Sequence, residues 1–285
     1  MNSAAANRGR RLPSNPKLVV GIVAMALIVA IAALAPWLAP HDPLEQDLLA
    51  QNLPPFWLPG HDPAYLLGTD SLGRDLLSRL IWGVRPVLIV MVIGAAFSGL
   101  LGVAIGLSAG YYGGWIDALF SRIIEVFTSF PPMVVAIVLV AVVGPGLGAV
   151  VMAIVLIGWT RFARVVRGEV LVLREQDFVT AANLLGFNAG RILFRELLPN
   201  VLPIVLALLA LEMGRAIVVE AVLAFIGFSA SDVATWGGII ADGRNYIYQA
   251  WWIMTFPIIA VVLSVLALSL LADGLRLALD PVLRR

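Results

Sequence analysis

The sequence predicts an all-α membrane protein with six transmembrane helices. Of its 285 residues, 61% are hydrophobic and only 13% are charged, and the mean hydropathy is +0.96. Such values are typical of a helical protein that crosses the membrane several times, and not of a soluble domain. Long uncharged runs recur along the chain, separated by short polar stretches that hold most of the charges.

The composition argues against most enzymatic functions. The chain has no cysteine, which excludes disulfides and thiolate chemistry, and only two histidines, His41 and His61. Its single lysine, Lys17, does not follow a glycine-rich turn, so the chain lacks an ATP-binding P-loop. No paired carboxylates or Ser–His arrangement supports a membrane hydrolase. A net charge of +1 gives no basis for binding nucleic acid. We expect no catalytic residue, metal or cofactor in this chain.

The N-terminal region predicts a polar tail, residues 1–17, followed by a first transmembrane helix, residues 18–38. The alternative is a cleaved signal peptide, because Ala33 and Ala35 have the spacing of a cleavage site. The apolar run is longer than a usual signal core, and Pro36 directly after the site opposes cleavage. We therefore favour a retained helix.

Residues 39–85 are rich in proline, aspartate and glycine, and they predict a long loop. The sequence His-Asp-Pro occurs twice, at 41–43 and 61–63. Two histidines beside two aspartates could hold a metal ion. Aspartate before proline is also typical of turns, and we favour that interpretation.

Residues 86–275 predict a core of five further helices. The first of them, 87–116, carries no charge until Asp117, and small residues recur at every fourth position, at Gly94, Ser98, Gly102 and Gly106. Such a ridge lets another helix approach closely. The partner is either a helix of this chain or a second membrane subunit.

The next helix is predicted to begin with Asp117 as its N-cap and to kink at Pro131 and Pro132, near its middle. Interrupted membrane helices often line substrate pathways, although a purely structural kink is an equal alternative. A hairpin at 144–146 leads to a fourth helix, 147–160, which continues out of the bilayer through Arg161, Arg164 and Arg167. The fifth and sixth spans are 201–228 and 251–272.

Four ionisable residues fall within these spans: Glu125, Glu212, Arg215 and Glu220. A charge in lipid costs roughly 2.5–3.5 kcal/mol on insertion scales, so each should face protein or water. Glu212 and Arg215 are three residues apart and are predicted to pair. Pairing or pathway lining is favoured over a proton relay. The three glutamates are the main support for the alternative of an ion-coupled secondary transporter, against which stands the absence of a visible internal repeat.

Residues 177–200 form the longest polar interruption in the second half of the chain. Asp177 is predicted to cap a helix over 178–185, and Gly186 to end it in the left-handed conformation. Asn188 is predicted to cap a second helix, 189–197, which ends before Pro199. The first helix would present one apolar edge to a partner, made of Phe178, Ala181, Ala182 and Leu185.

The orientation follows from the distribution of basic residues. With the N-terminus inside, the outer loops hold only Arg74, Arg79, Arg85 and Arg244. The cytoplasmic segments then hold Arg8, Arg10, Arg11, Lys17, Arg122, Arg161, Arg164, Arg167, Arg174, Arg191, Arg195, Arg276, Arg284 and Arg285. Both tails, 1–17 and 276–285, and the 177–200 segment are therefore predicted to be cytoplasmic, and the 39–85 loop external.

The 177–200 segment resembles the cytoplasmic loop of binding-protein-dependent ABC transporter permeases. Their signature is Glu-Ala-Ala, three residues, Gly, nine residues, Ile, one residue, Leu-Pro. The matching positions here are Thr180, Ala181, Ala182, Gly186, Glu196, Leu198 and Pro199. The spacing is kept, and the departures are Thr180 for the acid and Glu196 for the isoleucine.

Further stretches are similar to the second permease subunit of the dipeptide, oligopeptide and nickel transporters. They are 67–70, 72–75, 78–79, 110–115 with Asp117, 131–132, 166–168, 198–200, 236–237 and 241–244. Each is weak alone, but their order and spacing together are specific. The resemblance covers the chain from about residue 18.

The resemblance implies a type I ABC importer permease fold with both termini inside, in the bacterial inner membrane. It implies a heterodimer with a related permease, two cytoplasmic ATPases that bind ATP and Mg²⁺, and an external binding protein that delivers di- or oligopeptides. A nickel chelate or glutathione is the alternative solute. The residues expected to couple to an ATPase are Phe178, Thr180, Ala181, Ala182, Leu185, Gly186, Leu198 and Pro199. Those expected along the translocation pathway are Glu125, Pro131, Pro132, Glu212, Arg215 and Glu220.

Overall fold

The computed structural model describes residues 15–228 and 233–279. Within these ranges the protein is a helical bundle, with a single isolated β-bridge between Thr69 and Asp75. Five helices are long and apolar enough to cross a membrane, and a sharply bent pair raises the number to six. The predicted all-α membrane fold is confirmed. Residues 1–14 and 280–285, which make up most of the two predicted tails, lie outside the described residues.

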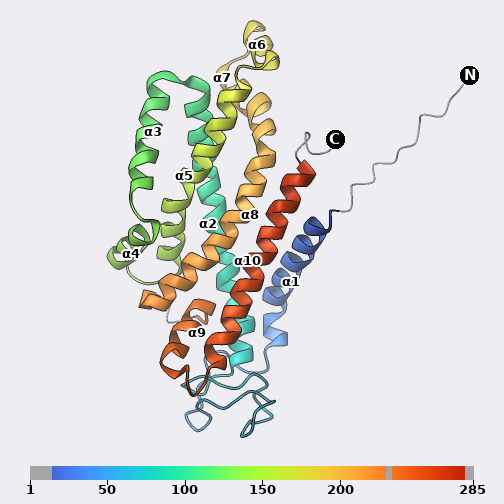
Figure 1. Cartoon of the computed structure of the whole chain (residues 1–285), viewed down its shortest axis with the longest axis vertical. Coiled ribbons are helices and arrows are strands. Elements are labelled where there is room, and N and C mark those ends of the chain that lie inside the picture. Colours follow the sequence, from blue (N-terminus) through green and yellow to red (C-terminus); the bar gives the residue numbers. More distant parts are fainter. Residues whose placement is uncertain (1–14, 229–232, 280–285) are drawn as a thin grey trace, which may run out of the picture.

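The first and last helices run side by side in opposite directions (Figure 1). They are α1, Pro16–Leu38, and α10, Trp252–Leu279. Lys17 pairs with Asp273 at 3.1 Å. A Cβ atom at Gly274 would lie 2.5 Å from the Cα atom of Leu18, so no larger residue fits between the helices there. The first predicted span is therefore an integral part of the bundle.

The second span begins earlier than predicted. Helix α2, Leu76–Tyr112, starts directly after Asp75, whose side chain accepts a hydrogen bond from the Ser78 amide. Residues 76–85 are therefore helical, and the prediction of a loop up to residue 85 is wrong there. The sequence did not predict this first part of α2, because Arg79 and Arg85 interrupt the apolar run and because Pro86, which lies inside the helix, is more often found at a helix boundary. A helix of 37 residues is about 55 Å long and extends beyond a hydrocarbon core of about 30 Å.

The ridge of small residues on α2 packs within this chain. It lies against α5, Leu147–Leu173. A Cβ atom at Gly102 would lie 2.4 Å from the carbonyl oxygen of Trp159, and one at Gly106 would lie 2.7 Å from that of Ala163. The hydroxyl of Ser98 donates to the Ile154 carbonyl at 3.4 Å. Of the two partners considered for this ridge, the structure selects the helix of the same chain.

The third span is broken rather than kinked. Helices α3, Gly114–Ser129, and α4, Pro132–Val143, meet at an angle of 86°. Each residue before a proline is extended, Phe130 with ψ 142° and Pro131 with ψ 122°, because the following proline ring disfavours the helical conformation. Two consecutive prolines therefore interrupt the helix completely. The N-cap of α3 is Gly113, and the predicted cap, Asp117, instead forms an ion pair with Arg167 of α5.

The second half of the 177–200 segment runs into the fifth span as one helical stretch, Ala189–Phe228. After α6, Asp177–Leu184, the chain forms α7, Ala189–Arg191, a π-helical segment, Ile192–Leu197, and α8, Leu198–Leu223. A second π-helical turn, Ala224–Phe228, ends this span. Pro199 does not stop the helix, because it lies in the first turn of α8, where a missing amide donor is tolerated. The short helix α9, Trp236–Gly243, precedes a 3₁₀ turn, Arg244–Tyr246, and neither was predicted.

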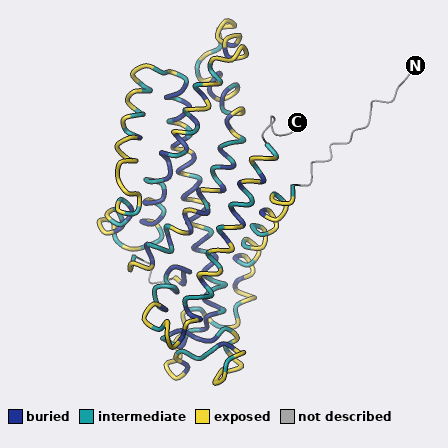
Figure 2. Tube along the Cα trace, viewed as in Figure 1, coloured by how far each residue is buried: buried dark blue, intermediate teal, exposed yellow. Residues whose placement is uncertain are grey.

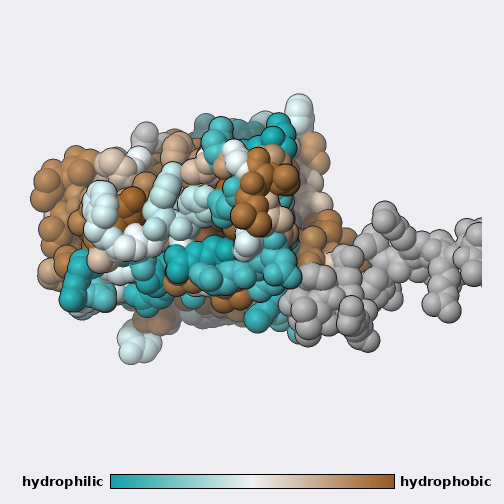
Figure 3. Space-filling model, turned by 90° about the horizontal axis from the view of Figure 1, so that it is seen from above, coloured by the Kyte–Doolittle hydropathy of each residue, from teal (hydrophilic) through white to brown (hydrophobic). Residues whose placement is uncertain are grey.

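The two ends of the bundle differ in what they carry. One end holds α6, the α2–α3 junction and the end of α10, whereas the 39–75 loop and α9 lie at the other (Figure 1). Buried residues concentrate along the interior helices, and exposed ones along α3 and α4 (Figure 2). Seen from the α6 end, hydrophilic side chains cover much of the central surface (Figure 3). This arrangement agrees with the predicted alternation of the spans.

Candidate functional site

Helix α6 is held on the bundle by two side chains of one face. Val179 and Ala182 are buried in an apolar cluster that includes Ile192, Leu193 and Val170. Helix α5 and the π-helical segment supply these partners. The predicted edge is therefore wrong at Ala182, which packs against its own chain and is not free for a partner.

Both ends of the break after α6 have the predicted geometry. Gly186 has φ +71°, and the amides of Gly186 and Phe187 donate to the carbonyls of Asn183 and Ala182 at 3.0 and 3.1 Å. These two bonds define a Schellman motif, which ends a helix in the left-handed conformation. The side chain of Asn188 then accepts from the Arg191 amide at 2.8 Å, as a helix N-cap does.

The outward face of α6 is apolar and exposed. Leu184 is 84% exposed, Leu185 73% and Phe178 38%, and Ala181 between them is exposed as well. Leu184 was not among the predicted edge residues, although its spacing of three from Ala181 places it on the same face. The last residue of this eight-residue helix, Leu184, and its C-cap, Leu185, thus form a solvent-exposed leucine pair, which is a surface suited to a partner protein.

The other predicted coupling residues border this face. Thr180 is exposed, and its hydroxyl donates to the Gln176 carbonyl at 3.4 Å. Leu198 packs against the apolar cluster beneath α6, and Pro199 is exposed. Glu196 is half-buried, and its backbone carbonyl accepts from the Asn200 side chain at 2.6 Å.

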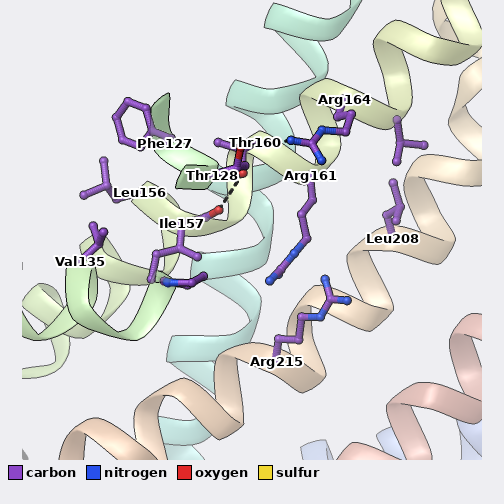
Figure 4. Close-up of a pocket in the computed structure, with 12 residues that line it drawn as sticks. Phe127, Thr128, Val135, Leu156, Ile157, Thr160, Arg161, Arg164, Leu208 and Arg215 are labelled. Atoms are coloured by element: carbon purple, nitrogen blue, oxygen red, sulfur yellow. Dashed lines mark hydrogen bonds between the residues drawn. The ribbon is translucent and has the colours of Figure 1, made fainter. Parts of the chain in front are cut away.

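Two neighbouring cavities lie where the broken span meets α5 and α8. Their volumes are about 370 and 430 Å³. Pro132, Ile157, Arg161 and Arg215 line both of them. Arg164, Thr128 and Thr160 line the first, and Glu212 the second. Arg161 and Arg215 extend from facing helices into the space between α5 and α8 (Figure 4). The structure thus brings Pro132, Glu212 and Arg215 together at one cavity, and their place along a translocation pathway stays a prediction.

Glu212 has two basic partners. Its carboxylate is buried and lies 3.0 Å from Nη1 of Arg161 and 3.6 Å from Nη1 of Arg215. The predicted pair with Arg215 exists, but Arg161 is the closer partner. Arg161 was predicted to lie where its helix continues out of the bilayer. Helix α5 does continue past it to Leu173, and Arg161 itself pairs with Glu212 of α8. Only the crossing of α5 and α8 reveals this contact.

The remaining predicted pathway residues lie elsewhere. Glu125 is exposed on α3 and pairs with Arg122 at 2.8 Å. Glu220 is buried near the external end, where its carboxylate accepts hydrogen bonds from the Thr235 side chain and the Gly237 amide. In the described part of the chain, Glu125, Glu220 and Pro131 do not line the two cavities. The three glutamates therefore form no common site for a coupled ion.

A buried ion-pair network joins the external loop to α2 and α9. Asp70 is fully buried and pairs with Arg79 and, at 2.7 Å, with Arg74. Both arginines also reach Asp242 of α9, at 2.8 and 3.0 Å. The loop residue Thr69 accepts at its carbonyl from the indole of Trp252 at 3.2 Å. The network fixes the loop against three helices.

The two His-Asp-Pro sequences form turns, as favoured. Asp42 accepts from the Leu44 amide at 2.8 Å, and Asp62 from the Ala64 amide at 2.9 Å. His41 lies beside Tyr65, with ring centroids 5.1 Å apart, whereas His61 contacts the Leu58 carbonyl. Across residues 15–228 and 233–279, no three potential metal ligands lie together.

Two family models match the chain. Residues 102–285 match the binding-protein-dependent transport system inner membrane component. Residues 7–55 match the N-terminal transmembrane domain of oligopeptide transport permease C. The second match reaches into the tail that the sequence resemblance did not cover.

Curated relatives and a solved structure agree with these matches. The di/tripeptide transport system permease protein of Pseudomonas aeruginosa is 39% identical over 93% of this chain and 88% of its own length. The dipeptide transport system permease protein of Bacillus subtilis is 38% identical over 97% and 85%. The MetNI methionine ABC transporter in an inward-facing conformation matches in fold, with a TM-score of 0.60 and 19% identity over 72% of this chain and 98% of the other.

Members of the matched family are inner-membrane permease subunits, not enzymes, and they work with a binding protein and an ATPase. The sequence has no cysteine and no P-loop lysine, and its long apolar spans are those of a membrane subunit; both features are consistent with such a role. The chain therefore belongs to the inner-membrane components of binding-protein-dependent ABC importers, as a multi-pass permease subunit.

Proposed function

We propose that this permease moves di- or oligopeptides across the bacterial inner membrane, driven by ATPase subunits that dock on the 177–200 segment. The solute class is supported by the names of relatives that align over nearly the whole chain, including the dipeptide and di/tripeptide permeases. The docking assignment is supported by the exposed apolar face of α6. That face is the single observation that carries the proposal.

The apolar face is well placed to transmit movement. Its leucines project outward, whereas Val179 and Ala182 fasten the same helix to α5 and to the π-helical segment that leads directly into α8. A force on α6 would therefore reach two membrane-spanning helices. These are also the helices that carry Arg161, Glu212 and Arg215 at the cavities. Closure of the ATPases would thus act on the walls of the pathway.

The assembly that we infer contains a second, related permease, two ATPases and an external binding protein. The two permeases would form one translocation path between them, surrounded by membrane lipid. ATP and Mg²⁺ would bind in the ATPases, because this chain has no P-loop lysine. Pro132, Glu212 and Arg215 are the predicted pathway residues best supported by their position at the cavities.

A charge placed on the apolar face of α6 tests the docking assignment. In the reconstituted complex, Leu184→Asp should lower peptide-stimulated ATP hydrolysis about tenfold or more, since burying an unpaired charge at an interface costs several kcal/mol. The matched control is Asn183→Asp, which adds the same charge at an exposed polar position beside it and should change hydrolysis less than twofold. Equal loss in both variants, or in neither, would contradict the docking face.

A further inference from the structure

We propose that Arg161, Arg164 and Arg215 form a carboxylate-binding site that holds the C-terminal carboxylate of a peptide inside the permease. The inference rests on the proposed peptide-transport function and names the group that the pathway recognises. It is drawn from the charge, depth and free hydrogen-bonding capacity of the two cavities.

The first argument is charge. Three arginines and one carboxylate, that of Glu212, are the ionisable residues among the described residues that line the cavities. They leave a formal excess of two positive charges. Arg161 and Arg215 keep 39% and 49% of their side-chain surface exposed, whereas Glu212 keeps 5%. The acid is thus enclosed, and the cations face the open space.

The second argument is depth. Along α5, Arg161 lies about 21 Å from the helix start at Leu147, and along α8 Arg215 lies about 12 Å from the helix end at Leu223. Measured from these ends, both distances are shorter than a hydrocarbon core of about 30 Å. Arginine at such depth is expensive unless an anion or water compensates it, and it commonly marks a substrate path. One buried glutamate compensates only part of the charge.

The third argument is hydrogen bonding. A guanidinium group carries five donors and binds a carboxylate with two of them at once. Within the described residues, Arg161 donates to Glu212 and Arg164 to the hydroxyl of Thr128 at 3.2 Å, one bond each, and Arg215 makes only the long 3.6 Å contact with Glu212. Most donors therefore remain free for a ligand.

The shape of the site also fits a small peptide. The first cavity, about 370 Å³, falls in the usual range for ligand pockets, about 300–1,000 Å³. Besides the arginines, its wall contains Thr128 and Thr160 and the apolar side chains of Phe127, Val135 and Leu156 (Figure 4). A charged end and an apolar wall suit a ligand that always carries a carboxylate but varies in its side chains.

Glu212 acts in this arrangement as an internal competitor. In the empty site it holds Arg161 and Arg215, and an arriving carboxylate takes over part of that pairing. Retention is therefore weak enough for release, which a transport pathway requires. Glu212→Gln should consequently bind a carboxylate ligand several-fold more tightly than the wild type.

Binding of a dipeptide and its amide to the purified permease–ATPase complex tests the site. The complex is placed in nanodiscs of phosphatidylcholine without binding protein, and the probes are radiolabelled alanyl-alanine and alanyl-alanine amide. The wild type should bind the acid about tenfold more tightly than the amide, the usual loss of one charge-assisted bond. Arg161→Gln and Arg215→Gln should abolish this preference without weakening the amide. The control Arg276→Gln removes an exposed arginine of α10 outside the cavities and should keep the preference.

Several results would overturn the inference. It is wrong if the wild type binds the acid and the amide equally, or if both the Arg161→Gln and the Arg215→Gln variant still prefer the acid. If Arg161→Gln dissociates the complex while its assembled fraction keeps the preference, the arginines instead pair with an acid of the second permease. If phosphatidylglycerol in the nanodisc abolishes binding of the acid, they instead bind a lipid phosphate. Charge-keeping Arg161→Lys and Arg215→Lys variants should fold, and they should retain part of the preference.

A parallel uptake measurement separates this inference from the proposed function. Proteoliposomes with binding protein and ATP should import the dipeptide. If the wild type imports no peptide, the proposed function fails, and the site falls with it. If the wild type imports the dipeptide but binds acid and amide equally, the proposed function stands and the carboxylate site alone is wrong.

Discussion

Asp70 is fully buried at the external end of the bundle, although it carries a charge. Its partners Arg74 and Arg79 come from the loop end and from α2, and Asp242 completes the network from α9. Removing one member of a buried ion pair leaves the others uncompensated, which costs about 3–5 kcal/mol. The residue therefore matters more for stability than surface charges do.

Asp70→Asn is expected to lower the unfolding temperature of the detergent-solubilised permease markedly, because it leaves Arg74 and Arg79 to share the single carboxylate of Asp242. The measurement is thermal unfolding followed by fluorescence. Asp273→Asn serves as the control, since the side chain of Asp273 is 59% exposed and that of its partner Lys17 is 50% exposed. It should shift the transition little, as exposed ion pairs do. A similar shift in both variants would contradict the role given to the network.

Gly186 is the residue at which sequence reasoning and structure agree most closely. Glycine adopts φ +71° without strain, and a Cβ atom added there would meet nothing within 4 Å. The residue is therefore required by its backbone conformation, and not by crowding within this chain. That conformation was predictable because a glycine directly after a helical run commonly ends the helix in this way. Ala182, by contrast, could not be assigned, since its burial depends on the distant helix α5.

At the scale of elements, the contact between α2 and α5 organises the bundle. Gly94, Gly102, Gly106 and Gly110 each face a side chain or backbone atom of α5 that a Cβ atom would approach within 3 Å. The two backbones are therefore as close as side chains permit. The four-residue spacing predicted such a ridge, but not its partner.

Gly102→Ala should destabilise the permease, because the new methyl group would lie 2.4 Å from the Trp159 carbonyl and force α2 away from α5. Overpacking of this kind costs typically about 1–3 kcal/mol. The matched control is Gly168→Ala in α5, where a Cβ atom meets nothing within 4 Å. Retained folded fraction after heating, measured by size-exclusion chromatography, should fall for the first variant alone. Equal behaviour of both would refute the close approach.

The 177–200 segment and the broken span show how neighbouring elements change a local prediction. Pro199 would end an isolated helix, yet the π-helical segment before it places the proline in the first turn of α8. Pro131 and Pro132 were expected to kink a span, and together they break it, because each excludes the helical conformation from the residue before it. The continuation of the helix through Pro199 could be seen only in the three-dimensional arrangement. The break at Pro131 and Pro132, by contrast, follows from steric clashes between neighbouring residues.

At the scale of the whole molecule, the alternation of spans places α6 and the 39–75 loop at opposite ends (Figure 1). The chain contains no cysteine, so single cysteines can report sidedness without background. In intact inverted and right-side-out vesicles, His61→Cys should react with an impermeant maleimide only from outside. Asn183→Cys should react only from the cytoplasmic side. The cysteine-free parent should not react, and labelling of both positions from one side would disprove the orientation.

The helical membrane fold and the order of the spans follow from the sequence alone, as does an interruption at Pro131 and Pro132, although it was predicted as a kink and is a break. The turns of the external loop and the left-handed conformation of Gly186 follow from the sequence as well. All of these depend on hydropathy or on hydrogen bonds and sterics between residues near in sequence. The folded chain alone shows that Glu212 pairs with Arg161, and that Ala182 faces inward and Leu184 outward. It alone also shows that Asp70 is linked to Asp242 of α9 through Arg74 and Arg79. These contacts arise where helices cross, and crossing is set by the packing of the whole bundle, which no single segment encodes.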